Sequence, residues 1–241
     1  MRLSQTLYGK LTVFFTAVFF LVFLTHFSEA ATVEGIIRFE GEAPTMKELA
    51  MSADPVCAAL HKTPILSESL VLGEGKTMAN VLVYVKNVPA GIPVIIPTEP
   101  AIVDQAGCKY APHVLAIVAG QEVKFLNPDG TLHNVHTLSK INPEFNAAMP
   151  KFKKEMTKKF EKSEAPFAIK CDVHPWMGAW IAVFDHAFFS VTKEDGKFSI
   201  TGLPAGTYEI EAWHEKLGTQ TASVVIDETK TQDFKFARPV A

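Results

Sequence analysis

The stretch Cys171-Asp-Val-His-Pro-Trp-Met177 brings three metal-binding side chains into seven residues: the thiol of Cys171, the imidazole of His174 and the thioether of Met177. A second imidazole, His133, lies upstream. Two imidazoles and one thiolate in a trigonal arrangement, with a weak axial methionine, are the donors of a blue-copper electron-transfer centre. The sequence therefore predicts one copper site with the ligands His133, Cys171, His174 and Met177.

Other interpretations of the same stretch are a zinc or iron–sulfur site, a catalytic cysteine–histidine pair, or a buried cysteine with chance neighbours. Structural zinc usually requires a second pair of ligands at matching spacing, and the three cysteines of the chain form no CxxC pair. A catalytic pair needs the imidazole placed as a base, whereas both side chains of so short a loop reach one metal more easily. We therefore favour copper.

Residues 1–30 have the pattern of a secretory signal peptide. Two positive charges precede an apolar run over residues 11–24, and small residues occupy positions 28 and 30, where signal peptidase reads the chain. The alternative is an uncleaved membrane anchor, because residues 11–27 are nearly long enough to span a bilayer. We expect cleavage, and hence a periplasmic or secreted protein without stable membrane insertion.

Loss of the signal removes two cations and one anion, so the formal charge changes from −3 to −4. This mild charge gives no indication of nucleic-acid or membrane binding. Export also favours disulfides, and pairing Cys57 with Cys108 leaves Cys171 free as a ligand. The alternative is that Cys57 and Cys108 are two unrelated buried thiols.

Short β-rich runs separated by turns predict an all-β sandwich or barrel. One segment, Met46–Leu60, has the pattern of a short helix broken at Pro55. The predicted strands are Val33–Phe39, Val81–Val85, Val114–Val118, Glu122–Leu126, Phe167–Lys170, Trp180–Phe184, Phe198–Ile200, Tyr208–Trp213 and Ala222–Ile226.

The strands divide into two predicted sandwiches. Residues 95–185 enclose all four candidate ligands and have the size of an ordinary domain. The flanking segments, 31–94 and 186–241, contain the stretch VTKEDGKFSITGLPAGTYEIEAWHEKLG and resemble the transthyretin-like or carboxypeptidase regulatory-like sandwich. We interpret the chain as a copper domain inserted in, or joined to, this second sandwich; the alternative is one continuous elaborated sandwich.

The motif His133-Asn-Val-His136, followed by Cys171-Asp-Val-His-Pro-Trp-Met177, resembles the cupredoxins, a Greek-key family that includes amicyanin and plastocyanin. The short ligand loop is most similar to that of amicyanin. The resemblance covers roughly residues 110–185 and implies the same four ligands. It also implies that His174 lies near the surface as the electron exit, and that the function is linked to methylamine oxidation.

The resemblance assigns supporting roles to two neighbours of the ligands. Asn134 is expected to join the two ligand loops by hydrogen bonds. Asp172 departs from the Ser or Thr usual in the family, and the preceding Lys170 carries the opposite charge. Trp176 either shields the site or forms part of a contact surface. His136 competes with His133, but residues three apart on a strand face opposite sides, and we choose His133.

A basic run, KFKKEMTKKFEK at 151–162, contains six lysines and two glutamates. Its ordinary interpretation is a solvated face, and its functional interpretation is a patch that steers an acidic redox partner. The expected function is thus electron transfer to a protein partner, which docks at this run or near His174. A copper-holding or copper-delivery protein and a metal-free binding module are the alternatives. No catalytic motif is evident, and we do not expect an enzyme.

Overall fold

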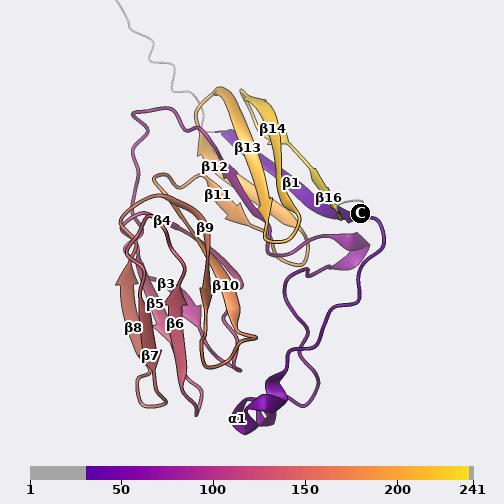
Figure 1. Ribbon diagram of the computed structural model, residues 1–241. Helices are drawn as coiled ribbons and strands as arrows, with labels where there is room; N and C mark the ends of the chain where they lie inside the picture. The colour runs from indigo at the N-terminus through magenta and orange to yellow at the C-terminus, as the bar shows by residue number, and fades with distance from the viewer. Residues whose placement is uncertain (1–30, 239–241) are drawn as a thin grey trace, which may run out of the picture.

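The computed structural model describes residues 31–238, and this part of the chain is almost entirely β-structure (Figure 1). The prediction of an all-β fold is confirmed, and each of the nine predicted strands is present, with shifted ends in most cases. The predicted signal peptide, residues 1–30, lies outside the described residues. Within residues 31–238, no helix is long and apolar enough to cross a membrane.

One sandwich is built from the beginning and the end of the described chain. Its first sheet has the order β12-β1-β15, with β16 also paired to β1, and its second has the order β11-β2-β13-β14. The strands are β1 (Ala31–Glu40), β2 (Leu82–Val85), β11 (Phe189–Val191), β12 (Lys197–Leu203), β13 (Gly206–His214), β14 (Gly218–Ile226), β15 (Lys230–Thr231) and β16 (Phe234–Ala237).

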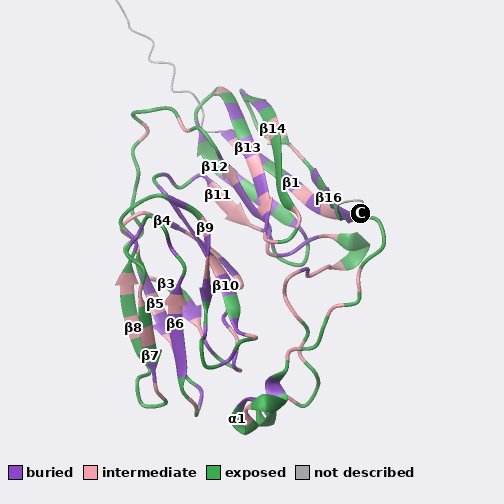
Figure 2. Ribbon diagram, viewed as in Figure 1, coloured by how far each residue is buried: buried purple, intermediate pink, exposed green. Residues whose placement is uncertain are grey.

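The sequence explains the burial pattern of one strand and the conformation of one turn in this sandwich. Alternate residues of β13 are buried, as expected for a strand with one face on a core (Figure 2). The turn at residues 194–196 places Gly196 at φ +66°, where a side chain is strained, and an added Cβ would lie 2.6 Å from the carbonyl oxygen of Ile37. Only glycine fits there.

The other sandwich is built from residues 101–184. Its sheets have the orders β4-β10-β9-β6-β7 and β3-β5-β8. The strands are β3 (Ala101–Asp104), β4 (Val114–Val118), β5 (Glu122–Leu126), β6 (His133–Thr137), β7 (Asn146–Met149), β8 (Glu155–Lys159), β9 (Glu164–Lys170) and β10 (Gly178–Phe184). The basic run therefore forms an edge strand, β8, and the turn before it, rather than a helix.

The two sandwiches share a small apolar core. Leu82 of β2 packs with Val114 of β4 and with Ala182 and Phe184 of β10, and the indole rings of Trp180 and Trp213 meet beside them. The strands of the two sandwiches thus come from residues 31–85 with 189–237 and from residues 101–184. The domain boundaries at 94 and 185 and the transthyretin-like assignment of the outer parts stay predictions.

A long connection between β1 and β2 holds the short helices η1 (Met51–Ala53), α1 (Pro55–Ala59) and η2 (Glu74–Lys76). Its α1 part is bonded to the sandwich of residues 101–184, whereas η2 contacts β1. Of the helix expected over Met46–Leu60, only η1 and α1 are present, and the break falls at Asp54, one residue before Pro55. Pro55 begins α1 instead, because proline is tolerated at the first helical position and the Asp54 carboxylate accepts hydrogen bonds from the next backbone N–H groups. Figure 1 shows α1 at the lower end of the molecule.

Candidate metal centre

Strand pairing brings the two ligand segments together. His133 begins β6, Cys171 follows β9, and β6 and β9 are antiparallel neighbours. The loop after Cys171 is closed by two backbone hydrogen bonds, from Cys171 N to the Met177 carbonyl (3.2 Å) and from Met177 N to the His174 carbonyl (2.9 Å). The loop therefore has a defined shape before any metal binds.

Three of the four predicted ligands offer their donor atoms to one point. The Nδ1 atoms of His133 and His174 are 3.0 Å apart, and Cys171 Sγ lies 3.8 Å from His174 Nδ1. The donor atoms of all three residues lie within 4.8 Å of one another. The three side chains are buried, and so is Met177 in the same loop.

This donor set fits a metal ion. Metal bonds of about 2.0 Å to imidazole nitrogen and about 2.3 Å to thiolate, the values for zinc, place neighbouring donors roughly 3.3 to 3.8 Å apart. The observed separations of 3.0 and 3.8 Å are close to that spacing. One thiolate with two imidazoles is also the combination that suits copper.

Asn134 joins the two ligand segments. Its Oδ1 accepts hydrogen bonds from the backbone N–H of Asp172 (2.8 Å) and from the thiol of Cys171 (3.3 Å), and its Nδ2 donates to Asn146 Oδ1 (2.7 Å). A side chain that contacts both the sulfur and the loop backbone fixes their relative position.

His136 does not face the ligand cluster. Its Nδ1 lies 2.9 Å from Asp172 Oδ2 and its Nε2 lies 3.2 Å from Glu144 Oε1, on the opposite face of β6 from His133. Lys170 Nζ is 3.0 Å from Asp172 Oδ1, and this hydrogen bond, with those from Asn146 and His136, lowers the pKa of Asp172 to about 2. The charges of Lys170 and Asp172 therefore offset each other beside the site.

His174 is not near the surface, contrary to the expectation from the resemblance. It is 1% exposed, because the connection that carries α1 covers it. Its Nε2 lies 3.0 Å from Asp54 Oδ2 and 3.7 Å from Cys57 Sγ. We call residues 51–60 the cover segment.

The cover segment is tied down covalently. The structure contains the expected disulfide between Cys57 of α1 and Cys108. Trp176 donates from Nε1 to the Cys108 carbonyl (3.0 Å), and its ring lies 4.9 Å from that of His174. Trp176 thus packs against the imidazole of His174 and joins the ligand loop to the disulfide.

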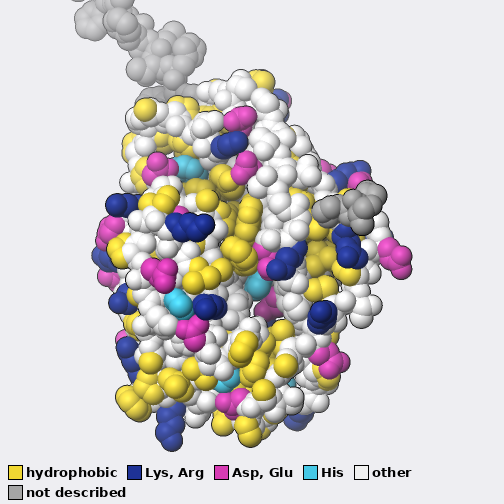
Figure 3. Space-filling view, in the orientation of Figure 1, with side chains coloured by type: hydrophobic (Ala, Val, Ile, Leu, Met, Phe, Trp, Pro, Cys, Tyr) yellow, Lys and Arg dark blue, Asp and Glu magenta, His cyan; other side chains and the backbone are white. Residues whose placement is uncertain are grey.

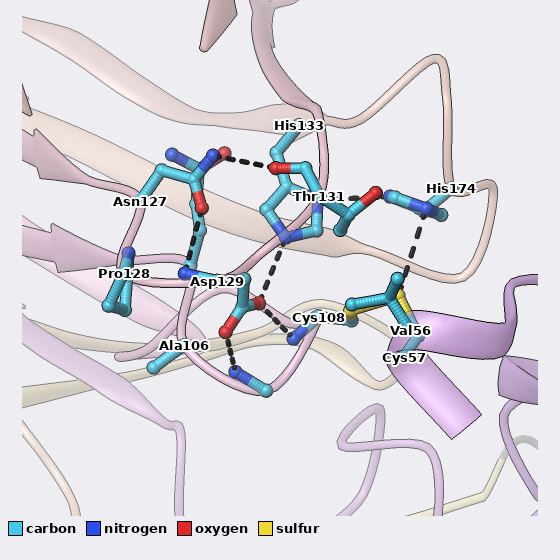
Figure 4. A network of polar contacts seen from close by, with 12 residues as sticks. Val56, Cys57, Ala106, Cys108, Asn127, Pro128, Asp129, Thr131, His133 and His174 are labelled. Carbon is cyan, nitrogen blue, oxygen red and sulfur yellow. Dashed lines mark hydrogen bonds and ion pairs between the residues drawn. A yellow bond between two sulfur atoms is a disulfide. The ribbon is translucent and has the colours of Figure 1, made fainter. Parts of the chain in front are cut away.

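The outer edge of His133 also meets a carboxylate. His133 Nε2 lies 2.9 Å from Asp129 Oδ2, which accepts a second hydrogen bond from the backbone N–H of Cys108 (2.8 Å). Figure 4 shows His133 directed at Asp129, with the disulfide on the side of His174. The amide of Asn127 fixes the turn that presents Asp129.

Hydrogen bonds within the cluster shift the pKa of His133 and the pKa of Cys171 in opposite directions. Burial opposes both charges, but hydrogen bonds to Asp129 and Cys171 raise the pKa of His133 to about 9. Hydrogen bonds from His133 and from backbone N–H groups likewise lower the pKa of Cys171 against the effect of burial. The thiolate is the form that binds a metal.

The remaining histidines of the described residues lie outside the ligand cluster. His61 Nε2 contacts the Gly107 carbonyl (2.8 Å), and His113 pairs with Glu215 across the two sandwiches. His186 and His214 are buried, and burial lowers the pKa of each.

Sequence reasoning missed Asp54 and Asp129. Asp54 is 120 positions from His174, so no local spacing links them, although Asp before Pro is a signal for a helix start. Asp129 lies four positions before His133 in an Asn-Pro-Asp-Gly stretch, which indicates only a turn.

No family model and no curated protein matches the chain. Parts of solved structures do. A copper-containing nitrite reductase from Thermus scotoductus SA-01 is 23% identical at a TM-score of 0.34, covering 42% of this chain and 26% of the reductase. The Cu(I) form of an amicyanin variant is 21% identical at 0.33, covering 44% and 99%. A purple cupredoxin from Nitrosopumilus maritimus is 24% identical at 0.30, covering 35% and 99%. The chain spans about a quarter of the length of the reductase.

Proposed function

We propose that this protein is a periplasmic electron carrier with one type 1 copper site. The observation that carries the proposal is the buried cluster in which His133 Nδ1, His174 Nδ1 and Cys171 Sγ face one point. Copper bound there would alternate between Cu(I) and Cu(II) and so supply the electron-transfer chemistry. Met177, in the same closed loop, would be the fourth ligand.

The chain contributes a rigid, dry site. The closed ligand loop and Asn134 hold the three donors in place before the metal arrives, which limits rearrangement when the charge changes. Trp176 and the cover segment exclude water from the imidazoles.

Burial also favours an electron carrier over an enzyme. A catalytic metal site keeps an open position for substrate or water. Here His133, Cys171 and His174 are at most 2% exposed, and every group of candidate ligands found within residues 31–238 includes one of the two histidines. An electron can pass through the protein atoms that bury these side chains, whereas a substrate cannot reach the metal.

The test is the absorption spectrum of the protein with Cu(II). We expect an intense blue thiolate-to-copper band that Cys171→Ser abolishes, because the band requires the sulfur. Substitution of Ser190, a residue of the other sandwich, by Ala is the control and should leave the band intact. A weak spectrum typical of an ordinary tetragonal Cu(II) complex would contradict the proposal.

The basic run is the proposed docking site of an acidic redox partner. Lys154 Nζ lies 3.3 and 3.5 Å from the carbonyl oxygens of Pro128 and Asp129, beside the residue that contacts His133. Figure 3 shows hydrophobic side chains gathered at the lower end of the molecule, where α1 lies in Figure 1. The six lysines of the run are Lys151, Lys153, Lys154, Lys158, Lys159 and Lys162.

Salt dependence tests this docking site. Oxidation by the anion ferricyanide should slow as salt is added, because charge steering is screened over about 8 Å at physiological ionic strength. Reversing Lys153 and Lys159 to Glu should flatten the dependence, whereas Lys235→Glu, in the other sandwich, should not. Equal salt dependence in all three proteins would leave the run as a solvated face. An amine-oxidising enzyme is the partner class that the amicyanin resemblance offers for the same assay.

A copper-holding or delivery protein is the second candidate. The buried His174 and its covalently tied cover favour retention of the metal over release. A Cu(I) chelator separates the two functions: a carrier should lose copper slowly without denaturant, and rapid, complete transfer would favour delivery.

A further inference from the structure

Each of the two clustered imidazoles contacts a carboxylate through its Nε2 atom, on the edge of the ring that faces away from the cluster. His174 Nε2 lies 3.0 Å from Asp54 Oδ2, and His133 Nε2 lies 2.9 Å from Asp129 Oδ2. Because the Nδ1 atoms face the cluster, the Nε2–H groups are the ones that donate to these carboxylates. Both rings are thereby fixed in tautomer and orientation.

Asp54 comes from the connection between β1 and β2, outside the sandwich that holds the ligands. Its other oxygen, Oδ1, accepts hydrogen bonds from the backbone N–H groups of Val56 (2.7 Å) and Cys57 (3.2 Å). Thr131 Oγ1 also donates to Oδ2 (3.4 Å). The carboxylate that contacts His174 is thus the N-cap of α1, and its direction is set by the helix.

Asp129 is fixed in a parallel manner. Its two oxygens accept from the backbone N–H groups of Gly107 (3.0 Å) and Cys108 (2.8 Å). Because Cys108 is bonded to Cys57, the two carboxylates belong to one closed circuit: from His174 through Asp54 and the disulfide to Asp129 and His133. Neither carboxylate can move far without the other.

We propose that Asp54 and Asp129 are positioning residues for the copper centre, acting through His174 and His133, with the Cys57–Cys108 disulfide holding them as a pair. The inference rests on the proposed function. A carboxylate behind a ligand imidazole makes that ligand more basic, which stabilises Cu(II) relative to Cu(I) and lowers the reduction potential. Asp54 also closes the edge of His174 that would otherwise meet solvent.

The variants separate this role from helix capping. In Asp54→Asn the cap is retained, because Asn and Asp cap helices equally well, but the amide cannot accept from the helix and from His174 together. Asp54→Ser keeps a capping hydroxyl that is too short to reach His174. Asp129→Asn tests the other imidazole. Glu40→Gln, an exposed position on β1, removes one charge from the other sandwich as a control.

The first measurement uses the metal-free protein. Two imidazole Nε2–H protons should be seen by NMR as slowly exchanging, strongly downfield signals. The His174 signal should be lost in both Asp54 variants and kept in Asp129→Asn, and the His133 signal should behave in the opposite way. Signals that persist in both Asp54 variants would overturn the role of Asp54.

The second measurement is the reduction potential with copper bound. We expect each variant at Asp54 or Asp129 to shift the ratio of Cu(II) to Cu(I) affinity about tenfold toward Cu(I), a rise of about 59 mV, with no shift in Glu40→Gln. An unchanged potential in a blue protein would overturn the inference alone. Absence of the blue band in the parent would refute the proposed function, while the NMR measurement would still decide the contacts.

Discussion

Removing the Cys57–Cys108 bridge should lower the free energy of unfolding by about 4 kcal/mol. The bridge joins residues 51 positions apart, and the chain-entropy model assigns about that amount to a loop of this length. The double variant Cys57→Ser, Cys108→Ser leaves Cys171 as the only cysteine of the sequence. The loss arises mainly because the unfolded chain gains freedom once the loop is open.

Urea unfolding of the metal-free protein measures this loss. The midpoint should fall, and the slope should rise, because an uncrosslinked unfolded chain exposes more surface. The parent protein, unfolded with its disulfide reduced, is the matched control and should give the same curve as the variant. A loss below about 1 kcal/mol, with an unchanged slope, would refute the entropic account of the bridge.

Three further outcomes are expected. Burial would raise the pKa of Glu164, but hydrogen bonds from the 139–142 loop lower it to about 2. Because this pKa is lower in the folded protein, the resulting stability is complete above pH 4.5 and is lost as the pH falls toward 2. Acid titration of unfolding should therefore show about 3 kcal/mol of pH-dependent stability that Glu164→Gln lacks, and identical curves would exclude this role. Met177→Gln should keep the copper and lower its potential, measured by voltammetry, because the axial ligand tunes the metal; an unchanged potential would remove Met177 from the site. His133→Ala should abolish the blue band and His136→Ala should retain it, and the reverse result would exchange the two assignments.

The sequence predicts those parts of the fold in which local pattern and tertiary environment agree. The ends of β5, Glu122–Leu126, are found from sequence because its apolar residues alternate and a glycine turn precedes it. β8 is missed because it is an edge strand without a fully buried residue, so its lysines give no period. Phe160, after its end, is buried, whereas Phe152 is 82% exposed.

The site, too, can be predicted from the sequence only in part. The three clustered donors lie in two short motifs that the sequence displays directly. The burial of His174 cannot be predicted from those motifs, because the residues that cover it come from a connection more than 100 positions away. Likewise, only the folded chain shows that Asp172 is paired with Lys170.

The origin of the cover segment also decides how this protein can be divided. A fragment cut at residues 95–185 would keep the four proposed ligands, but it would separate Cys108 from Cys57 and uncover His174. The orphaned thiol could then couple two fragments in an oxidising solution. The unit to transplant into another scaffold is therefore discontinuous: it consists of the ligand sandwich together with residues 51–60, and a designer who follows the sheets alone would leave part of the metal site behind.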